Sequence, residues 1–267
     1  TVTVTGVNDD VDDGDQAYNI VLAAAISDDS NYNGVNPDDV SVSNTDNNTA
    51  GFTVSAISGA TTEAAGTATF TVVLTSEPTS DVTIGVSSSD TGEGTVNTAS
   101  LVFTAGNWNT PQTVTVSGVN DDIDDGNQAY NIVLAAATSS DSNYNGVNPD
   151  DVSVTNSDND TKGITVSAIS GATTEAASTA TFTVVLTSEP TSDVTIGVSS
   201  SDTGEGTVST ASLVFTAGNW NTPQTVTVTG VNDDVDDGNQ AYNIVLAAAT
   251  SSDSNYNGAN PDDAAVT

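Results

Sequence analysis

A repeat of 112 residues organises this chain. The segment "TVTVTGVNDD" at residue 1 returns as "TVTVSGVNDD" at 113 and as "TVTVTGVNDD" at 225. The same offset relates "VSAISGATTEAA" at 54 to its copy at 166, and "AGNWNTPQTVTV" at 105 to its copy at 217. A unit of this length is a whole domain, longer than a solenoid coil or a propeller blade. The sequence therefore predicts a tandem array of one small domain.

Within each repeat, apolar and polar residues alternate in short segments, the period of a half-buried β-strand. In the central repeat these segments are 52–58, 67–74, 81–87, 99–104, 112–118, 128–134 and 151–156. Clusters of Gly, Asn, Asp, Ser and Pro separate them, and no capped pattern of helical period competes. Seven short strands in about 110 residues are typical of an immunoglobulin-like sandwich. We therefore predict an all-β fold of tandem seven-stranded, immunoglobulin-like β-sandwiches, with strands A to G in chain order.

The phase of the strands predicts the domain boundaries. Residues 51–162 should form a complete sandwich and residues 163–267 a nearly complete one. Residues 1–50 contain only the last three strands of a repeat. We expect the chain to be a segment of a longer array, or this half to be completed by another chain, because unpaired strand edges invite pairing.

The charge of the chain restricts its partners. There are 36 acidic residues against one Lys, with no Arg and no His, for a formal net charge of -35. Such a surface repels nucleic acid and anionic membranes and favours cations. No apolar run is long enough for a membrane helix, and no signal peptide opens the sequence. We expect no enzyme, because His, Cys and nearly all cationic side chains are missing.

The acids are concentrated in particular loops. In an antiparallel sandwich the A–B, C–D and E–F loops and the exit from strand G fall at one pole. In the central repeat, acids occupy all four segments: Glu63, Asp90, Glu93, Asp121, Asp122, Asp124, Asp125, Asp158 and Asp160. Crowded carboxylates are relieved by protonation or by a bound cation, and exposed loop acids do not stay protonated at neutral pH. Ca²⁺ accepts irregular cages of loop oxygens, so we predict a calcium site. The alternative, that these acids form turns and keep the surface soluble, stays open.

Four motifs carry a resemblance to a known family: "TEAAGTATFTVVL", "SSSDTGEGT", "LVFTAGNWNTPQTVTVSGVNDDIDDGNQAYNIVL" and "SDND". In this order they resemble the Calx-beta domain, in the form repeated in giant calcium-dependent bacterial adhesins. The resemblance covers essentially the whole repeat. It implies calcium ligands at Glu63, Asp90, Asp121, Asp122, Asp158 and Asp160, and in the last repeat at Glu175, Asp202, Asp233 and Asp234.

The first and last repeats depart from this pattern. The first keeps Asp46 at its exit but has Asn48 in place of the second exit acid and lacks the early Glu, whereas the last ends before its exit acids. We expect both sites to be incomplete. Further candidate ligands are the other acids of the E–F loops: Asp9, Asp10, Asp124, Asp125 and Asp236.

These features favour a calcium-rigidified extender, or stalk, of a bacterial surface adhesin or extracellular filament. Its partners would be adjacent repeats of the same protein or other copies in a filament, with no nucleic acid and no membrane insertion. The alternative is a module that binds a glycan or surface through Trp108 and Trp220 of the D–E loops, although packing of these rings over the sandwich end or against the preceding domain is the favoured interpretation. Asp141, Asp150 and Asp151 of the F–G loop could face a cation or simply be solvated.

Overall fold

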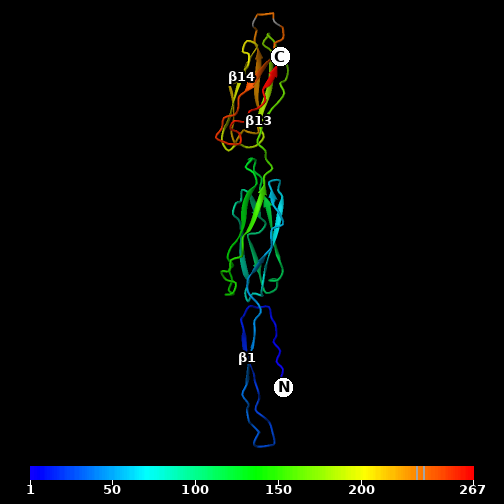
Figure 1. Ribbon diagram of the computed structural model, residues 1–267, viewed down its shortest axis with the longest axis vertical. Helices are drawn as coiled ribbons and strands as arrows, with labels where there is room; N and C mark the ends of the chain where they lie inside the picture. The colour runs from blue at the N-terminus through cyan, green and yellow to red at the C-terminus, as the bar shows by residue number, and fades with distance from the viewer. Residues whose placement is uncertain (233, 237) are drawn as a thin grey trace. The chain divides into compact units, whose positions relative to one another are not determined.

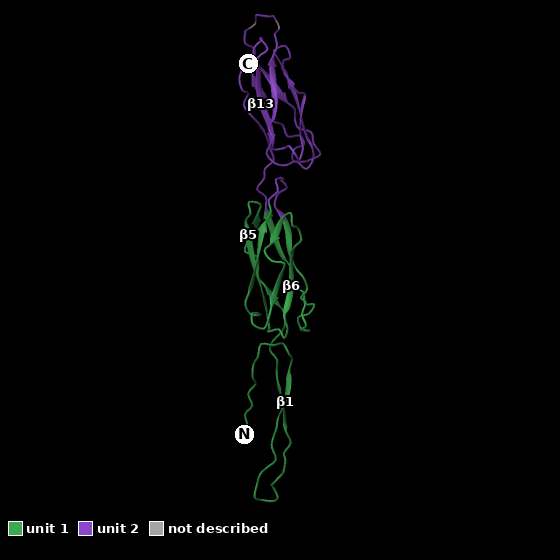
Figure 2. Cartoon of the chain, turned by 180° about the vertical axis from the view of Figure 1, so that it is seen from behind, with its two compact units in different colours: residues 1–119, 129–156 green, residues 120–128, 157–267 purple. Residues whose placement is uncertain are grey.

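The computed structural model describes residues 1–232, 234–236 and 238–267. Every regular element in these residues is a β-strand (Figure 1). No helix in this part of the chain is long and apolar enough to cross a membrane. The chain divides into two compact units, residues 1–119 with 129–156 and residues 120–128 with 157–267 (Figure 2). The acidic loop 120–128 thus belongs to the same unit as the sandwich that follows it in sequence, which the phase of the repeat does not anticipate.

Two sheets form the sandwich of the central repeat. One sheet has the order β3-β5-β9-β7 and the other the order β4-β11-β10-β6-β8. The strands of the first sheet are β3 (Phe52–Val54), β5 (Thr67–Leu74), β9 (Gln112–Gly118) and β7 (Gly94–Val96). Those of the second are β4 (Thr61–Thr62), β11 (Val152–Ser157), β10 (Gln128–Leu134), β6 (Val82–Ser88) and β8 (Ser100–Phe103).

The alternation in sequence decides which face of each strand is buried. Along β5, every second side chain from Ala68 to Leu74 is buried, while the threonines between them face outward. Phe70 pairs with Val114 of β9, and both are almost completely buried. Ile84 and Ile132 face them from the second sheet in the same core cluster. Each such side chain stabilises the fold by about 1.5–3 kcal/mol relative to an exposed position.

The last repeat forms a second sandwich in the same way. Its sheets have the orders β12-β13-β17-β15 and β16-β14-β18-β19. The strands are β12 (Ile164–Val166), β13 (Thr179–Leu186), β14 (Val194–Ser200), β15 (Gly206–Val208), β16 (Ser212–Phe215), β17 (Gln224–Gly230), β18 (Tyr242–Leu246) and β19 (Ala264–Val266). The predicted all-β, tandem-sandwich fold is confirmed. The strands β4, β7 and β15 were not predicted, because two or three residues are too few to show a period.

Residues 1–50 form less structure than the sequence predicts. Only β1 (Gln16–Ile20) and β2 (Val40–Asn44) are present, paired antiparallel, and residues 1–7 form no strand. In the central repeat the corresponding strand β9 pairs with β5 and β7, and residues 1–50 contain no counterpart of either. Val2 is therefore 74% exposed, whereas its counterpart Val114 is 0% exposed. The prediction of three strands here was wrong, because a strand needs a partner and not only the right alternation.

Candidate metal centre

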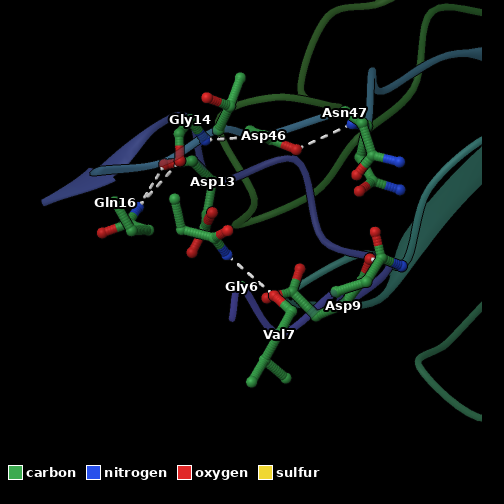
Figure 3. Close-up of a pocket in the computed structure, with 12 residues that line it drawn as sticks. Gly6, Val7, Asp9, Asp13, Gly14, Gln16, Asp46 and Asn47 are labelled. Atoms are coloured by element: carbon green, nitrogen blue, oxygen red, sulfur yellow. Dashed lines mark hydrogen bonds between the residues drawn. The ribbon is translucent and has the colours of Figure 1, made fainter. Parts of the chain in front are cut away.

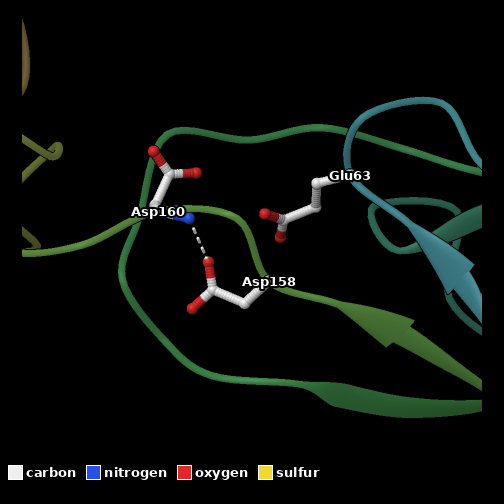
Figure 4. A group of neighbouring side chains, drawn as sticks. All are labelled: Glu63, Asp158 and Asp160. Carbon is white, nitrogen blue, oxygen red and sulfur yellow. Dashed lines mark hydrogen bonds between the residues drawn. The ribbon is translucent and has the colours of Figure 1, made fainter.

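One group of carboxylates in the central repeat joins the A–B turn to the exit. Glu63, Asp158 and Asp160 each offer an oxygen, and these oxygens all lie within 4.8 Å of one another (Figure 4). Glu63 is buried, at 4% exposure, and the two aspartates are half-buried. Three like charges this close repel one another strongly unless a proton or a cation is shared among them.

Tight packing fixes the turn that carries Glu63. The buried Thr61 hydroxyl of β4 lies 3.0 Å from the Tyr130 hydroxyl and donates to Asn156 Oδ1 at 3.1 Å. Gly118 at the end of β9 lies directly against this turn, since a Cβ there would come within 2.3 Å of the Thr62 carbonyl oxygen. The absence of a side chain at Gly118 therefore lets β4 approach closely enough to bring Glu63 to the exit acids.

Backbone N–H groups hold the Asp158 side chain in place. Its Oδ2 accepts from Gly126 N at 2.7 Å, and its Oδ1 accepts from Asp160 N at 2.7 Å. The Asp158 carboxylate thus ties the E–F loop to the exit. Each carboxylate oxygen has a second lone pair, so these bonds leave coordinating capacity.

Asp160 is the unsatisfied member of the group. Its Oδ2 is buried and has no hydrogen-bond partner. Burial raises the pKa of this carboxyl above its ordinary value, and the charges of Asp122, Asp158, Asp121 and Asp124 raise it further. Orphaned buried polar atoms are rare in folded proteins, and a bound ion is one of the partners that can satisfy them. The three potential ligand atoms of this group are all carboxylate oxygens, so the group suits a hard cation such as Ca²⁺.

A second group lies on the C–D and E–F loops. Oxygens of Glu93, Asp121 and Asp125 lie within 4.8 Å of one another. Asp121 Oδ1 also accepts from Ile123 N at 2.8 Å, which fixes the turn of the loop. Glu93 was assigned to this pole from the sequence but not selected as a ligand. Its position three residues after Asp90 in "SDTGEGT" is the one signal for it in the sequence, whereas the family resemblance implies Asp90 as the ligand from this loop.

Asn156 connects the two groups. It is 1% exposed, and its Oδ1 accepts from Thr61 beside Glu63. Its Nδ2 lies 3.3 Å from Glu93 Oε2 and donates to the Val119 carbonyl at 2.9 Å. This buried amide therefore contacts Glu93 of one group and the strand that leads to Glu63 of the other, a role that no pattern in the sequence indicates.

The other predicted ligands of the central repeat lie outside these groups. Asp90 Oδ1 accepts from Gly92 N at 2.9 Å, which closes a turn. Asp124 Oδ2 accepts from Lys162 N at 2.8 Å, so this carboxylate holds the exit segment. Asp122 is exposed, and its charge raises the pKa of Asp160.

In the first repeat two of the three predicted ligands line a polar hollow of about 250 Å³ (Figure 3). Asp9 and Asp46 both line it, whereas Asp10 does not. Asp46 accepts from Asn48 N at 2.8 Å and from Gly14 N at 2.7 Å, and these bonds lower the pKa of its carboxyl. Asp46 therefore makes the same hydrogen bonds as Asp158. The first repeat has Asn48 at the position of Asp160, so the second exit carboxylate is missing.

In the last repeat the predicted ligands are not brought together among the described residues. Glu175, the counterpart of buried Glu63, is exposed, and no strand corresponding to β4 forms before it. Asp202 Oδ1 accepts from Gly204 N at 2.9 Å, and Asp234 and Asp236 are exposed. Asp233 lies outside the described residues. In the central repeat β4 pairs with β11, and Thr61 of β4 donates to Asn156 of β11. The given sequence ends at Thr267, the counterpart of Thr155, and therefore includes no counterpart of Asn156.

The F–G and D–E loops resolve two questions that the sequence left open. Asp141 is buried, and its oxygens accept from the backbone N–H groups of Thr79 and Asn143. It is therefore a structural acid of the loop. Trp108 and Trp220 are partly buried and pack against the cores of their sandwiches.

The fold and the carboxylate groups define a class: tandem small β-sandwiches whose turns and loops gather acids beside the exit of the last strand. The model of the Calx-beta domain family matches residues 43–160 and 157–267. The chain belongs to the Calx-beta family, and the resemblance found in the sequence is confirmed.

Several solved structures are similar to this chain at low sequence identity. The calcium binding domain CBD12 of CALX1.1 is 16% identical, with 76% of this chain and 79% of that chain covered and a TM-score of 0.34. CBD12 from CALX1.2 is 15% identical, with coverage of 71% and 77% and a TM-score of 0.31. Domains 4–9 of the surface layer protein SbsC are 16% identical, with coverage of 98% and 40% and a TM-score of 0.28. No curated protein matches the sequence.

Proposed function

We propose that this chain is a non-catalytic, calcium-stiffened segment of an extracellular stalk, the extender of a bacterial surface adhesin or filament. The observation that carries the proposal is the buried, unpartnered Oδ2 of Asp160 within a group of three carboxylates. A divalent cation would supply the partner that this oxygen lacks. It would also offset part of the repulsion in a chain of net charge -35.

The residues that would hold Ca²⁺ come from four segments of the chain. Glu63 belongs to the A–B turn, Glu93 to the C–D loop, Asp121 and Asp125 to the E–F loop, and Asp158 and Asp160 to the exit. Ca²⁺ takes six to eight oxygen ligands in flexible geometry, so two such groups with added backbone oxygens or water suit it better than Mg²⁺. The ion would supply positive charge and coordination, and these residues would supply the positions.

The mechanical consequence follows from where the exit leads. Asp158 and Asp160 lie on the short segment that runs into the next repeat. Almost no linker separates the two repeats. A cation that ties this segment to Glu63 would restrict its motion. Binding to the folded state alone would also stabilise the fold, by about 2.7 kcal/mol at a free Ca²⁺ concentration of about 100 times Kd.

Small-angle X-ray scattering in millimolar Ca²⁺ and then in EGTA, at fixed ionic strength, tests the proposal. Chelation should shift the profile of the whole chain toward that of a flexible one. The double variant Asp121→Asn with Asp122→Asn should weaken calcium binding in a titration and reduce the response. Asp150→Asn removes an exposed carboxylate of the F–G loop and should match the wild type. Superimposable wild-type profiles with and without calcium would overturn the proposal.

A further inference from the structure

The acidic E–F loops contact a second surface through their backbone and not through their charges. In the unit that contains residues 120–128 and 157–267, Asn255 Nδ2 donates to the carbonyl of Asp124 at 2.5 Å. In the same unit, Glu189 N donates to the carbonyl of Asp122 at 2.6 Å. Two alternate carbonyls of the acidic loop thus meet two donors of the sandwich that follows.

The other unit repeats this pattern at the equivalent positions. Asn143 Nδ2 donates to the carbonyl of Asp12 at 2.5 Å, and Glu77 N donates to the carbonyl of Asp10 at 2.7 Å. Val11, between the two aspartates, also forms an isolated parallel bridge with Glu77. The same contact, between two loop carbonyls and two donors, therefore occurs in both units. This repetition supports a specific recognition surface.

A buried carboxylate holds together the two loops that form this surface. Asp253 is 5% exposed, and its oxygens accept from Thr191 N on the B–C loop and from Asn255 N on the F–G loop, both at 2.8 Å. Asp141 does the same in the central repeat. Burial of a carboxylate is costly unless hydrogen bonds compensate it, and here the bonds hold the two receiving loops together. Asp253 is thus a positioning residue for the Asn that makes the contact.

The first repeat contains a copy of this Asn that contacts no E–F loop carbonyl among the described residues. Asn31, the counterpart of Asn143 and Asn255, turns its Nδ2 back to Asp29 Oδ1 at 3.0 Å. The Asn that contacts a loop carbonyl lies 131 residues after it in the other two copies, and a position 131 residues before Asn31 falls outside the given sequence. The Asn side chain therefore reaches outward in the two copies where a loop is supplied and bonds within its own turn in the third.

The contact uses the backbone carbonyls of the loop, so the carboxylates can make separate interactions. Asp124 Oδ2 accepts from Lys162 N on the exit segment, while its carbonyl accepts from Asn255. Lys162 is the only basic side chain in the sequence, and its Nζ donates to Asn255 Oδ1 at 3.2 Å. Both ends of the Asn255 amide are thus used at this junction. Ala50 replaces Lys162 at the other junction. Its backbone N still donates to Asp12 Oδ2 at 2.8 Å, but it has no side-chain amine to donate to Asn143 Oδ1.

We propose that the B–C and F–G loops of each repeat form a docking site for the acidic E–F loop of the preceding repeat, with Asn143 and Asn255 as the recognition residues. The partner is a backbone segment of the same protein, read through its carbonyls. The site goes beyond the calcium function, because it joins consecutive repeats by hydrogen bonds that no cation mediates.

Hydrogen exchange of the full-length chain in saturating Ca²⁺ tests the proposal at the Glu189 amide, whose N–H donates to the loop. Asn255→Ala should speed exchange there roughly fivefold, the value of one hydrogen bond of ordinary strength. The control Asn31→Ala, at the position without a docked loop, should leave exchange at Glu77 and Glu189 unchanged. Core amides of β13 report that the variant is folded.

A second variant and a calcium titration separate this proposal from the calcium function. Asn143→Ala should act at Glu77 as Asn255→Ala acts at Glu189. Unchanged exchange at both amides would overturn the docking site even where Ca²⁺ binds normally. Faster exchange in a chain that binds no Ca²⁺ would support the docking site and overturn the calcium function.

Discussion

Replacing Asp160 by Asn should stabilise the central repeat when calcium is removed. The substitution keeps the shape of the side chain and removes one of three clustered charges. The first repeat already has Asn48 at the equivalent position. In saturating Ca²⁺ the advantage should disappear or reverse, because the cation relieves the same repulsion in the wild type and loses a charged ligand in the variant.

The magnitude follows from the geometry of the group. An oxygen of Asp160 lies within 4.8 Å of an oxygen of Glu63 and of one of Asp158. At this distance two unit charges repel by about 0.9 kcal/mol in water and by about 3.5 kcal/mol at an effective dielectric constant of about 20. Asp158 and Asp160 are only half-buried, so solvent screening favours the lower value. Two neighbours then give a stabilisation of about 2 kcal/mol.

Thermal unfolding monitored by tryptophan fluorescence measures this effect. A Trp220→Phe background leaves Trp108 as the reporter of the central repeat. For a domain of this size, 1 kcal/mol shifts Tm by about 4 °C, so Asp160→Asn should raise Tm in EGTA by about 8 °C. Calcium should then raise the Tm of the variant less than that of the wild type. A lower Tm for the variant in EGTA would refute the reasoning, since it would show that the charge of Asp160 stabilises the metal-free fold.

Tyr144→Phe should destabilise the central repeat by about 1–3 kcal/mol in urea unfolding, because it leaves the buried N–H of Ser76 without its acceptor. Tyr32→Phe, at the same repeat position but 64% exposed, should change stability by less than about 0.5 kcal/mol, and equal losses would contradict this account. Asp141 provides a pH test: burial raises the pKa of its carboxyl, but hydrogen bonds from two backbone N–H groups, one of them on Thr79, outweigh it and lower the pKa below 3.8. The stability from this carboxylate is present above that value and is lost as the pH falls through the lowered pKa. Urea midpoints of wild type and Asp141→Asn should therefore differ at pH 7 and converge in acid, and a constant difference would argue against the assignment.

Much of the fold could be predicted from local pattern. Alternation along segments such as 67–74 and 112–118 identifies strands whatever their neighbours are, because successive side chains of a strand point to opposite faces. The positions of Gly and Asp between them identify the loops. The prediction failed at residues 1–7, where the same alternation is present but the strands that would pair with it are not.

The candidate centre was predicted less completely than the fold. The sequence located the acids on the right loops and, through the family resemblance, selected Glu63, Asp121, Asp158 and Asp160, which the structure brings into its two groups. It did not select Glu93 as a ligand. Loop position indicates which acids are near one another, but the direction of each side chain depends on hydrogen bonds made by the folded loop.

The sequence by itself determined the tandem sandwich, its all-β class and the abundance of carboxylates, because these depend on periodicity and composition. Only the tertiary structure decided what each carboxylate does. Asp158, Asp124 and Asp141 accept backbone N–H groups and act as ties, whereas Asp160 is left with a buried, unpartnered oxygen. The physical reason is that the role of a charge depends on the donors and charges around it, and these come from segments far apart in the chain.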